Sequence, residues 1–98
     1  MRMGIEEILG DKREEILRIA AKHGVTSIRV FGSVARGEAG PDSDVDFLIE
    51  AGPDVTPWFP GGLVADLRDL LGRDVDVVEG CALRPRIGSH VLSEAIAL

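Results

Sequence analysis

Apolar residues recur along parts of the chain at the 3.6-residue spacing of an amphipathic helix. One such stripe follows Asp11, which we expect to cap the helix, and it stops before Gly24. A second stripe stops before Gly72. The positions that we expect to face the core are Ile16, Leu17, Ile19, Ala20 and Ala21 in the first helix and Leu63, Val64, Leu67, Leu70 and Leu71 in the second.

Three other segments show the β-branched content and alternation of strands. They cover residues 27–31, 45–50 and 74–79. Glycine and proline separate them from their neighbours, and a short helical turn fits within the first loop. The last element is expected to be a helix that Ser89 caps and that carries Ile96.

The resulting order of helix, strand, strand, helix, strand, helix predicts an α/β fold, a small mixed β-sheet packed with helices, as a single domain over residues 1–98. The chain is 45% hydrophobic, so it can bury a core. No apolar run approaches the roughly 20 residues that span a bilayer, and no signal stretch opens the chain, so we expect a cytoplasmic protein. Cys81 is the single cysteine, which excludes an internal disulfide. The net charge of −6 argues against nucleic acid as a partner.

The chemistry-bearing residues cluster between the first two strands. Asp44 and Asp46 stand two positions apart, so on a strand both carboxylates would point the same way. Like charges beside apolar residues repel and lose hydration, a cost that a divalent cation offsets. Magnesium and manganese prefer such oxygen ligands. Upstream, Gly32 permits close backbone approach, Ser33 offers a hydroxyl and an amide, and Arg36 offers a charge for a phosphate.

The third strand offers another carboxylate. Asp74 and Asp76 would share a face if both belong to the strand. If that strand lies beside the second, one of the two joins Asp44 and Asp46, and three carboxylates hold two metal ions about 4 Å apart. The spacing alone leaves the choice between Asp74 and Asp76 open.

The segment from Gly32-Ser33 through Arg36-Gly37 to Ser43-Asp44-x-Asp46 resembles the signature of the minimal nucleotidyltransferases, in the polymerase-β-like superfamily. Gly72-Arg73-Asp74-Val75-Asp76 is similar to the family's third-carboxylate segment. The resemblance covers nearly the whole chain and implies the nucleotidyltransferase fold of the polymerase-β palm type.

The resemblance also implies roles for individual residues. Gly32 and Ser33 would contact the triphosphate of ATP, while Asp44, Asp46 and Asp76 would bind two Mg²⁺ ions, with Mn²⁺ as an alternative. Asp76 would also help to activate the attacking hydroxyl. Members of the family are often antitoxins of an all-helical HEPN toxin, and some transfer AMP to a tyrosine of that toxin. These features lead us to expect a protein adenylyltransferase.

Other readings of the same residues remain open. The chain could be a catalytically idle antitoxin that masks its partner, or it could transfer a nucleotide to a small molecule. Its sequence is compatible with either a homodimer or a hetero-oligomer. Arg36 could instead pair with Glu38 or Asp42. Trp58 and Phe59 could cover the core or bind a partner.

Overall fold

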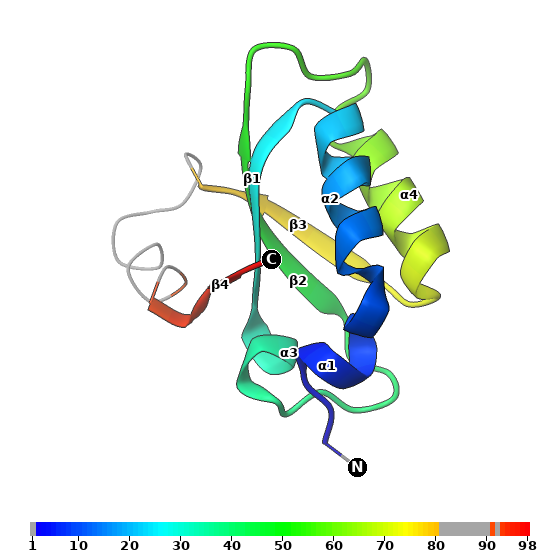
Figure 1. Ribbon diagram of the computed structural model, residues 1–98, viewed down its shortest axis with the longest axis vertical. Helices are drawn as coiled ribbons and strands as arrows, with labels where there is room; N and C mark the ends of the chain where they lie inside the picture. The colour runs from blue at the N-terminus through cyan, green and yellow to red at the C-terminus, as the bar shows by residue number, and fades with distance from the viewer. Residues whose placement is uncertain (1, 81–90, 92) are drawn as a thin grey trace.

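The computed structural model describes residues 2–80, 91 and 93–98, which form helices packed on a four-stranded sheet (Figure 1). The elements are α1 (Ile5–Ile8), the 3-10 helix η1 (Gly10–Lys12), α2 (Arg13–Lys22), β1 (Val25–Phe31), α3 (Gly32–Arg36), β2 (Val45–Ala51), α4 (Gly61–Leu71), β3 (Val75–Glu79) and β4 (Ile96–Ala97).

The sheet is mixed, as predicted, with the strand order β3-β2-β1-β4. β1 pairs antiparallel with both β2 and β4, whereas β2 and β3 run parallel. A parallel pair needs a crossover between its strands, and α4 supplies it. This strand order and register place the end of β1 next to the starts of β2 and β3.

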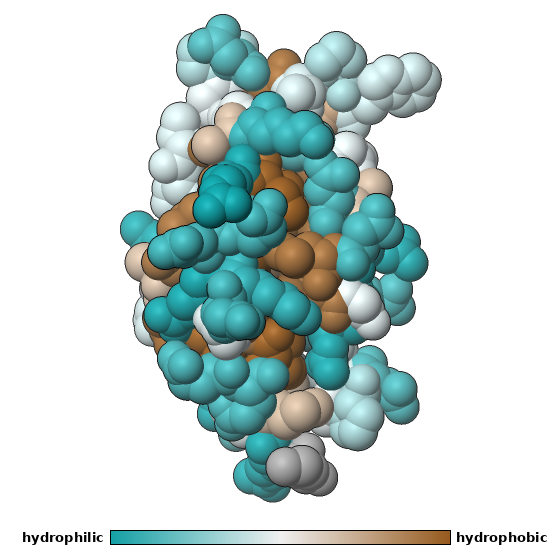
Figure 2. Space-filling view, turned by 45° about the vertical axis from the view of Figure 1, so that its right-hand side comes forward, coloured by the Kyte–Doolittle hydropathy of each residue, from teal (hydrophilic) through white to brown (hydrophobic). Residues whose placement is uncertain are grey.

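The core lies between the sheet and the helices α2 and α4, which stand side by side on one side of the sheet in Figure 1. Alternate residues of β2 enter it. On the face shown in Figure 2, hydrophilic residues surround smaller apolar areas. No helix in the described ranges is long and apolar enough to cross a membrane. The buried core residues are Leu9, Ile16, Ala20, Val25, Ile28, Val30, Val34, Ala39, Val45, Phe47, Ile49, Leu63 and Leu67.

The start of the first long helix differs from the prediction. Asp11 lies inside η1, and no side chain caps α2, which begins at Arg13. Leu17 is also 42% exposed and Ala21 is exposed, so the core-facing stripe of α2 is narrower than the sequence suggests. Ile16 and Ala20, four residues apart, carry the buried contact.

The end of the chain contradicts the predicted final helix at Ile96. Val91, Ser93 and Glu94 are helical, but Ile96 and Ala97 form β4. They pair with Val30 and Arg29 of β1, because the outer edge of β1 offers backbone groups that a local pattern does not reveal. Ser89, the predicted cap, lies outside the described residues.

A buried histidine joins α2, α4 and the loop between β2 and α4. His23, at the C-terminal end of α2, is only 6% exposed. Its Nδ1 lies 2.8 Å from Thr56 Oγ1, and its Nε2 lies 2.7 Å from Asp66 Oδ2. A Cβ atom on Gly62 would lie 2.9 Å from the ring carbon Cε1. The ring therefore sets how closely the loop and α4 approach α2.

The same loop carries Trp58 and Phe59, for which the sequence left open whether they cover the core or bind a partner. Phe59 packs against the core, whereas Trp58 is 92% exposed with a φ of +69°. A positive φ is costly for a bulky residue. The loop therefore packs the partly buried ring of Phe59 against the core and presents Trp58 to solvent.

We predict that Asp66→Asn destabilises the protein at pH 7. The hydrogen bond from His23, and then that from Lys22, holds the pKa of Asp66 below its ordinary value of 3.8. A lowered carboxyl pKa stabilises the fold above the unfolded-state pKa, and this stabilisation disappears as the pH falls through the folded-state pKa. Urea unfolding should show a deficit in Asp66→Asn at pH 7 that shrinks below about pH 3.8.

Asp69→Asn is the matched control, because Asp69 is exposed on the same helix. An equal deficit in the control, or a deficit in Asp66→Asn that does not depend on pH, would contradict this account of the His23 contacts.

Candidate active site

The predicted site residues gather at one end of the sheet, where β1 ends and β2 and β3 begin. In the strand register, Asp46 of β2 stands opposite Phe31 of β1 on one side and Asp76 of β3 on the other. Asp44 precedes β2 rather than belonging to it, which corrects the expectation that both Asp44 and Asp46 lie on the strand. The third strand does lie beside the second, which is the condition under which a carboxylate of β3 comes near Asp46.

Gly32 lies in contact with the Asp46 carboxylate. Its φ is +75°, a conformation that favours glycine. A Cβ atom at this position would lie 2.2 Å from Asp46 Oδ2, which is far closer than atoms can approach. Gly32 also opens α3, whose predicted helical turn at residues 33–36 is confirmed. The group that approaches the Gly32 backbone closely in this structure is therefore the side chain of Asp46.

The carboxylate of Asp46 is in an unfavourable environment for a negative charge. Burial raises the pKa of Asp46 above its ordinary value, and the nearby charges of Asp76 and Asp44 raise it further. Arg36 acts in the opposite direction, while Glu94 adds to the increase. Three other acidic residues thus act on Asp46, and a bound cation would offset this repulsion.

The turn that carries Asp44 is closed by its own hydrogen bonds. The backbone N–H of Gly40 donates to Ser43 Oγ at 2.8 Å, and the N–H of Ser43 donates to the carbonyl of Gly40 at 3.2 Å. The Ser43 hydroxyl and backbone thus both take part in closing this turn. On the other side of Asp44, the N–H of Val45 donates to the carbonyl of Asp74 at 3.0 Å.

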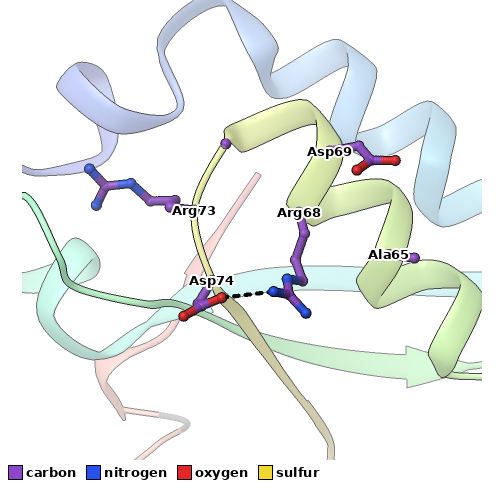
Figure 3. A pocket seen from close by; sticks show the side chains of 6 residues that line it. Ala65, Arg68, Asp69, Arg73 and Asp74 are labelled. Carbon is purple, nitrogen blue, oxygen red and sulfur yellow. Dashed lines mark ion pairs between the residues drawn. The ribbon is translucent and has the colours of Figure 1, made fainter.

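Asp74 and Asp76 have different surroundings. Asp74 precedes β3, and its Oδ1 lies 3.0 Å from Nη2 of Arg68 on α4 (Figure 3). Asp76 stands in register with Asp46. The ion pair lines a groove of about 410 Å³ whose lining residues are Ala65, Arg68, Asp69, Gly72, Arg73 and Asp74. Asp74 is thus directed to α4, which favours Asp76 as the partner of Asp46.

Arg36, at the end of α3, is paired on two sides. Its Nε donates to Glu38 Oε2 at 3.1 Å, and its Nη1 donates to Glu94 Oε1. Both hydrogen bonds raise the pKa of Arg36 above its ordinary value, with the bond to Glu94 having the larger effect. The ion pair with Glu38 matches the alternative considered for Arg36, although its guanidinium also lies near enough to Asp46 to lower the pKa of that carboxyl.

Sequence reasoning missed Glu94. Its side chain is 13% exposed and reaches the site because β4 runs back along β1. No spacing within the sequence links position 94 to position 36, so only the folded chain reveals the contact.

The carboxylates fit a divalent cation in chemistry, although they are not a preassembled set of ligands. Within residues 2–80, 91 and 93–98, no three His, Cys, Asp or Glu side chains converge closely enough to hold a metal ion. Because like charges repel, Asp44, Asp46 and Asp76 are expected to lie apart until a cation binds between them. Their oxygen donors, and the destabilised charge of Asp46, suit Mg²⁺ or Mn²⁺.

Comparisons with known proteins identify the family of this chain. The family model of the nucleotidyltransferase domain matches residues 13–98. Protein adenylyltransferase MntA of Thermococcus cleftensis is 39% identical over 94 residues, which cover 94% of this chain and 90% of that protein. A solved structure provisionally described as a minimal nucleotidyltransferase superposes with a TM-score of 0.85 at 45% sequence identity. The match covers 98% of this chain and 97% of the other.

A more distant structure shares the fold. It is a tri-AMPylated HEPN toxin of Shewanella oneidensis in complex with an MNT antitoxin, and it matches with a TM-score of 0.64 at 19% identity. The match covers 86% of this chain and 66% of that one.

We predict that Gly32→Ala perturbs Asp46 in addition to straining the backbone. Gly37→Ala is the matched control, because its φ of +73° is nearly the same and a Cβ atom there would meet nothing within 4 Å. Both variants should lose about 1–2 kcal/mol of unfolding free energy from the left-handed backbone. Gly32→Ala should lose more unfolding free energy than Gly37→Ala. It alone should also shift the carboxyl carbon NMR signal of Asp46. Equal effects of the two variants would contradict the assigned contact.

Proposed function

Because this chain belongs to the nucleotidyltransferase domain family, we propose that it transfers AMP from ATP to a hydroxyl group of a partner protein. Nucleotidyl transfer is the activity class of the family. One observation carries the proposal: Asp46 and Asp76 stand opposite each other on parallel strands, with the backbone of Gly32 beside Asp46. Asp46 and Asp76 are thereby held at the same end of the sheet, where a bound cation would offset the repulsion that raises the pKa of Asp46.

We assign Asp44, Asp46 and Asp76 as the ligands of two Mg²⁺ ions, for which Mn²⁺ can substitute. When bound, such ions neutralise charge on the triphosphate and make the acceptor hydroxyl more acidic. Asp76 is preferred to Asp74 as the third ligand because Asp74 pairs with Arg68. The three carboxylates come from two strands and one turn, so the fold itself determines their spacing.

The remaining residues would bind the nucleotide. Gly32 and Ser33, at the start of α3, are assigned to the triphosphate, and Arg36 to one of its phosphates. The acceptor oxygen forms a bond to the α-phosphorus, the bond between that phosphorus and the bridging oxygen breaks, and pyrophosphate leaves. Asp76 takes the proton of the acceptor hydroxyl. Since Arg36 is paired with Glu38 and Glu94, ATP binding would have to compete with at least one of these contacts.

We propose a tyrosine of a HEPN toxin as the acceptor, so that the chain acts as the antitoxin of the pair. Two likenesses support this choice. The relative from Thermococcus cleftensis, which matches nearly the whole chain, is named a protein adenylyltransferase. The Shewanella oneidensis structure that shares the fold is a toxin–antitoxin complex in which the toxin carries AMP.

A second candidate function is binding without catalysis, in which the chain masks its partner. The observation that favours it is Trp58, which is 92% exposed on a loop fixed by His23 and Phe59. An exposed tryptophan on a fixed backbone is a frequent centre of protein interfaces. The two functions are compatible, because an enzyme that modifies a protein must also bind it.

We predict that the chain adds AMP to a HEPN toxin in the presence of ATP and Mg²⁺, and that Asp44→Asn abolishes the reaction. Intact-mass spectrometry of the toxin would show a gain of one or more AMP units with the wild-type chain. Loss of a metal ligand should lower the rate by more than about a hundredfold, because the loss of a supporting residue alone costs 10- to 100-fold. Far-UV circular dichroism should remain unchanged, since Asp44 is exposed.

The outcomes separate the two candidates. A tight complex without any mass gain would favour masking. Full transfer by a variant that carries both Asp44→Asn and Asp46→Asn would refute the metal-site assignment.

We also predict that Asp76→Asn abolishes transfer, whereas Asp74→Asn retains most of it. The two residues are two positions apart in the chain and differ in their partners, so each variant controls for the other. Initial rates with the same toxin, ATP and Mg²⁺ would measure the difference. The reverse order of activities would identify Asp74 as the third ligand.

A further inference from the structure

We propose that Arg73 is a positioning residue of the active site, which holds the turn that presents Asp44 against the start of β3. The inference rests on the proposed function, because the role of Asp44 defines what must be positioned. Nothing in the local sequence pattern indicates this role, since Arg73 follows the glycine that ends α4 and precedes the strand.

The evidence is a pair of hydrogen bonds that join distant parts of the chain. Nη1 of Arg73 donates to the carbonyl of Ser43 at 3.1 Å, with a longer contact to the carbonyl of Gly40 at 3.4 Å. Both acceptors belong to the turn that immediately precedes Asp44. A single guanidinium nitrogen therefore contacts both ends of that turn, from a side chain that is itself partly buried.

Asp44 has few other constraints. It is exposed and lies just outside β2. The bond from the N–H of Val45 to the carbonyl of Asp74 fixes the backbone after it. The contacts of Arg73 fix the backbone before it. Residues 73 and 74 thus hold Asp44 from both sides, and they lie just before Asp76, so a single segment sets the relative position of the carboxylates.

The neighbouring arginine provides a contrast. Arg68 and Arg73 line the same groove, but in Figure 3 the side chain of Arg73 extends away from the ion pair between Arg68 and Asp74. Arg68 lies 57% exposed in a surface pair, which contributes little. Arg73 contacts backbone carbonyls with a planar group whose donors are fixed in direction, which lysine cannot reproduce.

The experiment compares Arg73→Met and Arg73→Lys with the control Arg68→Met. Methionine keeps the aliphatic stem without the donors, and lysine keeps the charge without the planar fork. Amide hydrogen exchange at Ser43 and Val45, followed by NMR, reports on the turn without requiring activity. Transfer kinetics at varied ATP and Mg²⁺ give kcat, KM and the Mg²⁺ concentration at half-maximal rate.

We expect Arg73→Met to raise the exchange rate at Ser43 by about tenfold or more, because the turn opens more often. The kcat should fall by about 10- to 100-fold, as expected for a misplaced site residue. The Mg²⁺ requirement should rise, while KM for ATP at saturating Mg²⁺ should change little. Arg73→Lys should recover only part of the loss, and Arg68→Met should match the wild type.

Unchanged exchange at Ser43 in Arg73→Met would overturn the inference, as would equal losses in Arg68→Met. If Arg73→Met does not fold, Arg73→Lys decides the question by the same measurements. If the wild type transfers no AMP, the proposed function fails, and hydrogen exchange together with Mg²⁺ titration followed by NMR still decides the role of Arg73.

Discussion

The contact between the Asp46 carboxylate and the backbone of Gly32 is the constraint around which this end of the molecule is arranged. It requires a residue without a Cβ atom at the end of β1, in a left-handed conformation, directly before α3. It also requires β1 and β2 to keep the register that sets Phe31 opposite Asp46. A shift of the chain at either position would separate Gly32 and α3 from Asp46.

Packing of the core and placement of the site depend on the same alternation. Val45, Phe47 and Ile49 of β2 are buried among the core residues, and Asp46 lies between the first two of them in sequence. A slip of one residue in the strand would turn the carboxylate toward the core and turn Val45, Phe47 and Ile49 away from it. The hydrophobic free energy that fixes the register therefore also fixes the position of Asp46, since both faces belong to one strand.

Much of this arrangement follows from the sequence, because helical and strand periods are local properties. They predicted both long helices and three strands, whereas the choice of Asp76 as the third site residue came from the resemblance to the family. β4 was missed, because its pairing depends on the free edge of β1 and not on any pattern near Ile96. The contacts of Glu94 and Arg73 were missed for the same reason, since each joins segments that are far apart in the chain.

The order of the elements has a consequence for biosynthesis. The first half of the site, from Gly32 to Asp46, is contained in two strands that are adjacent in sequence and pair directly. Asp76 arrives only after α4 and thirty positions later in the chain. Local contacts form sooner than distant ones. A chain emerging from the ribosome therefore has Gly32 and Asp46 before it has Asp76, and the proposed site is complete only when β3 has joined the sheet.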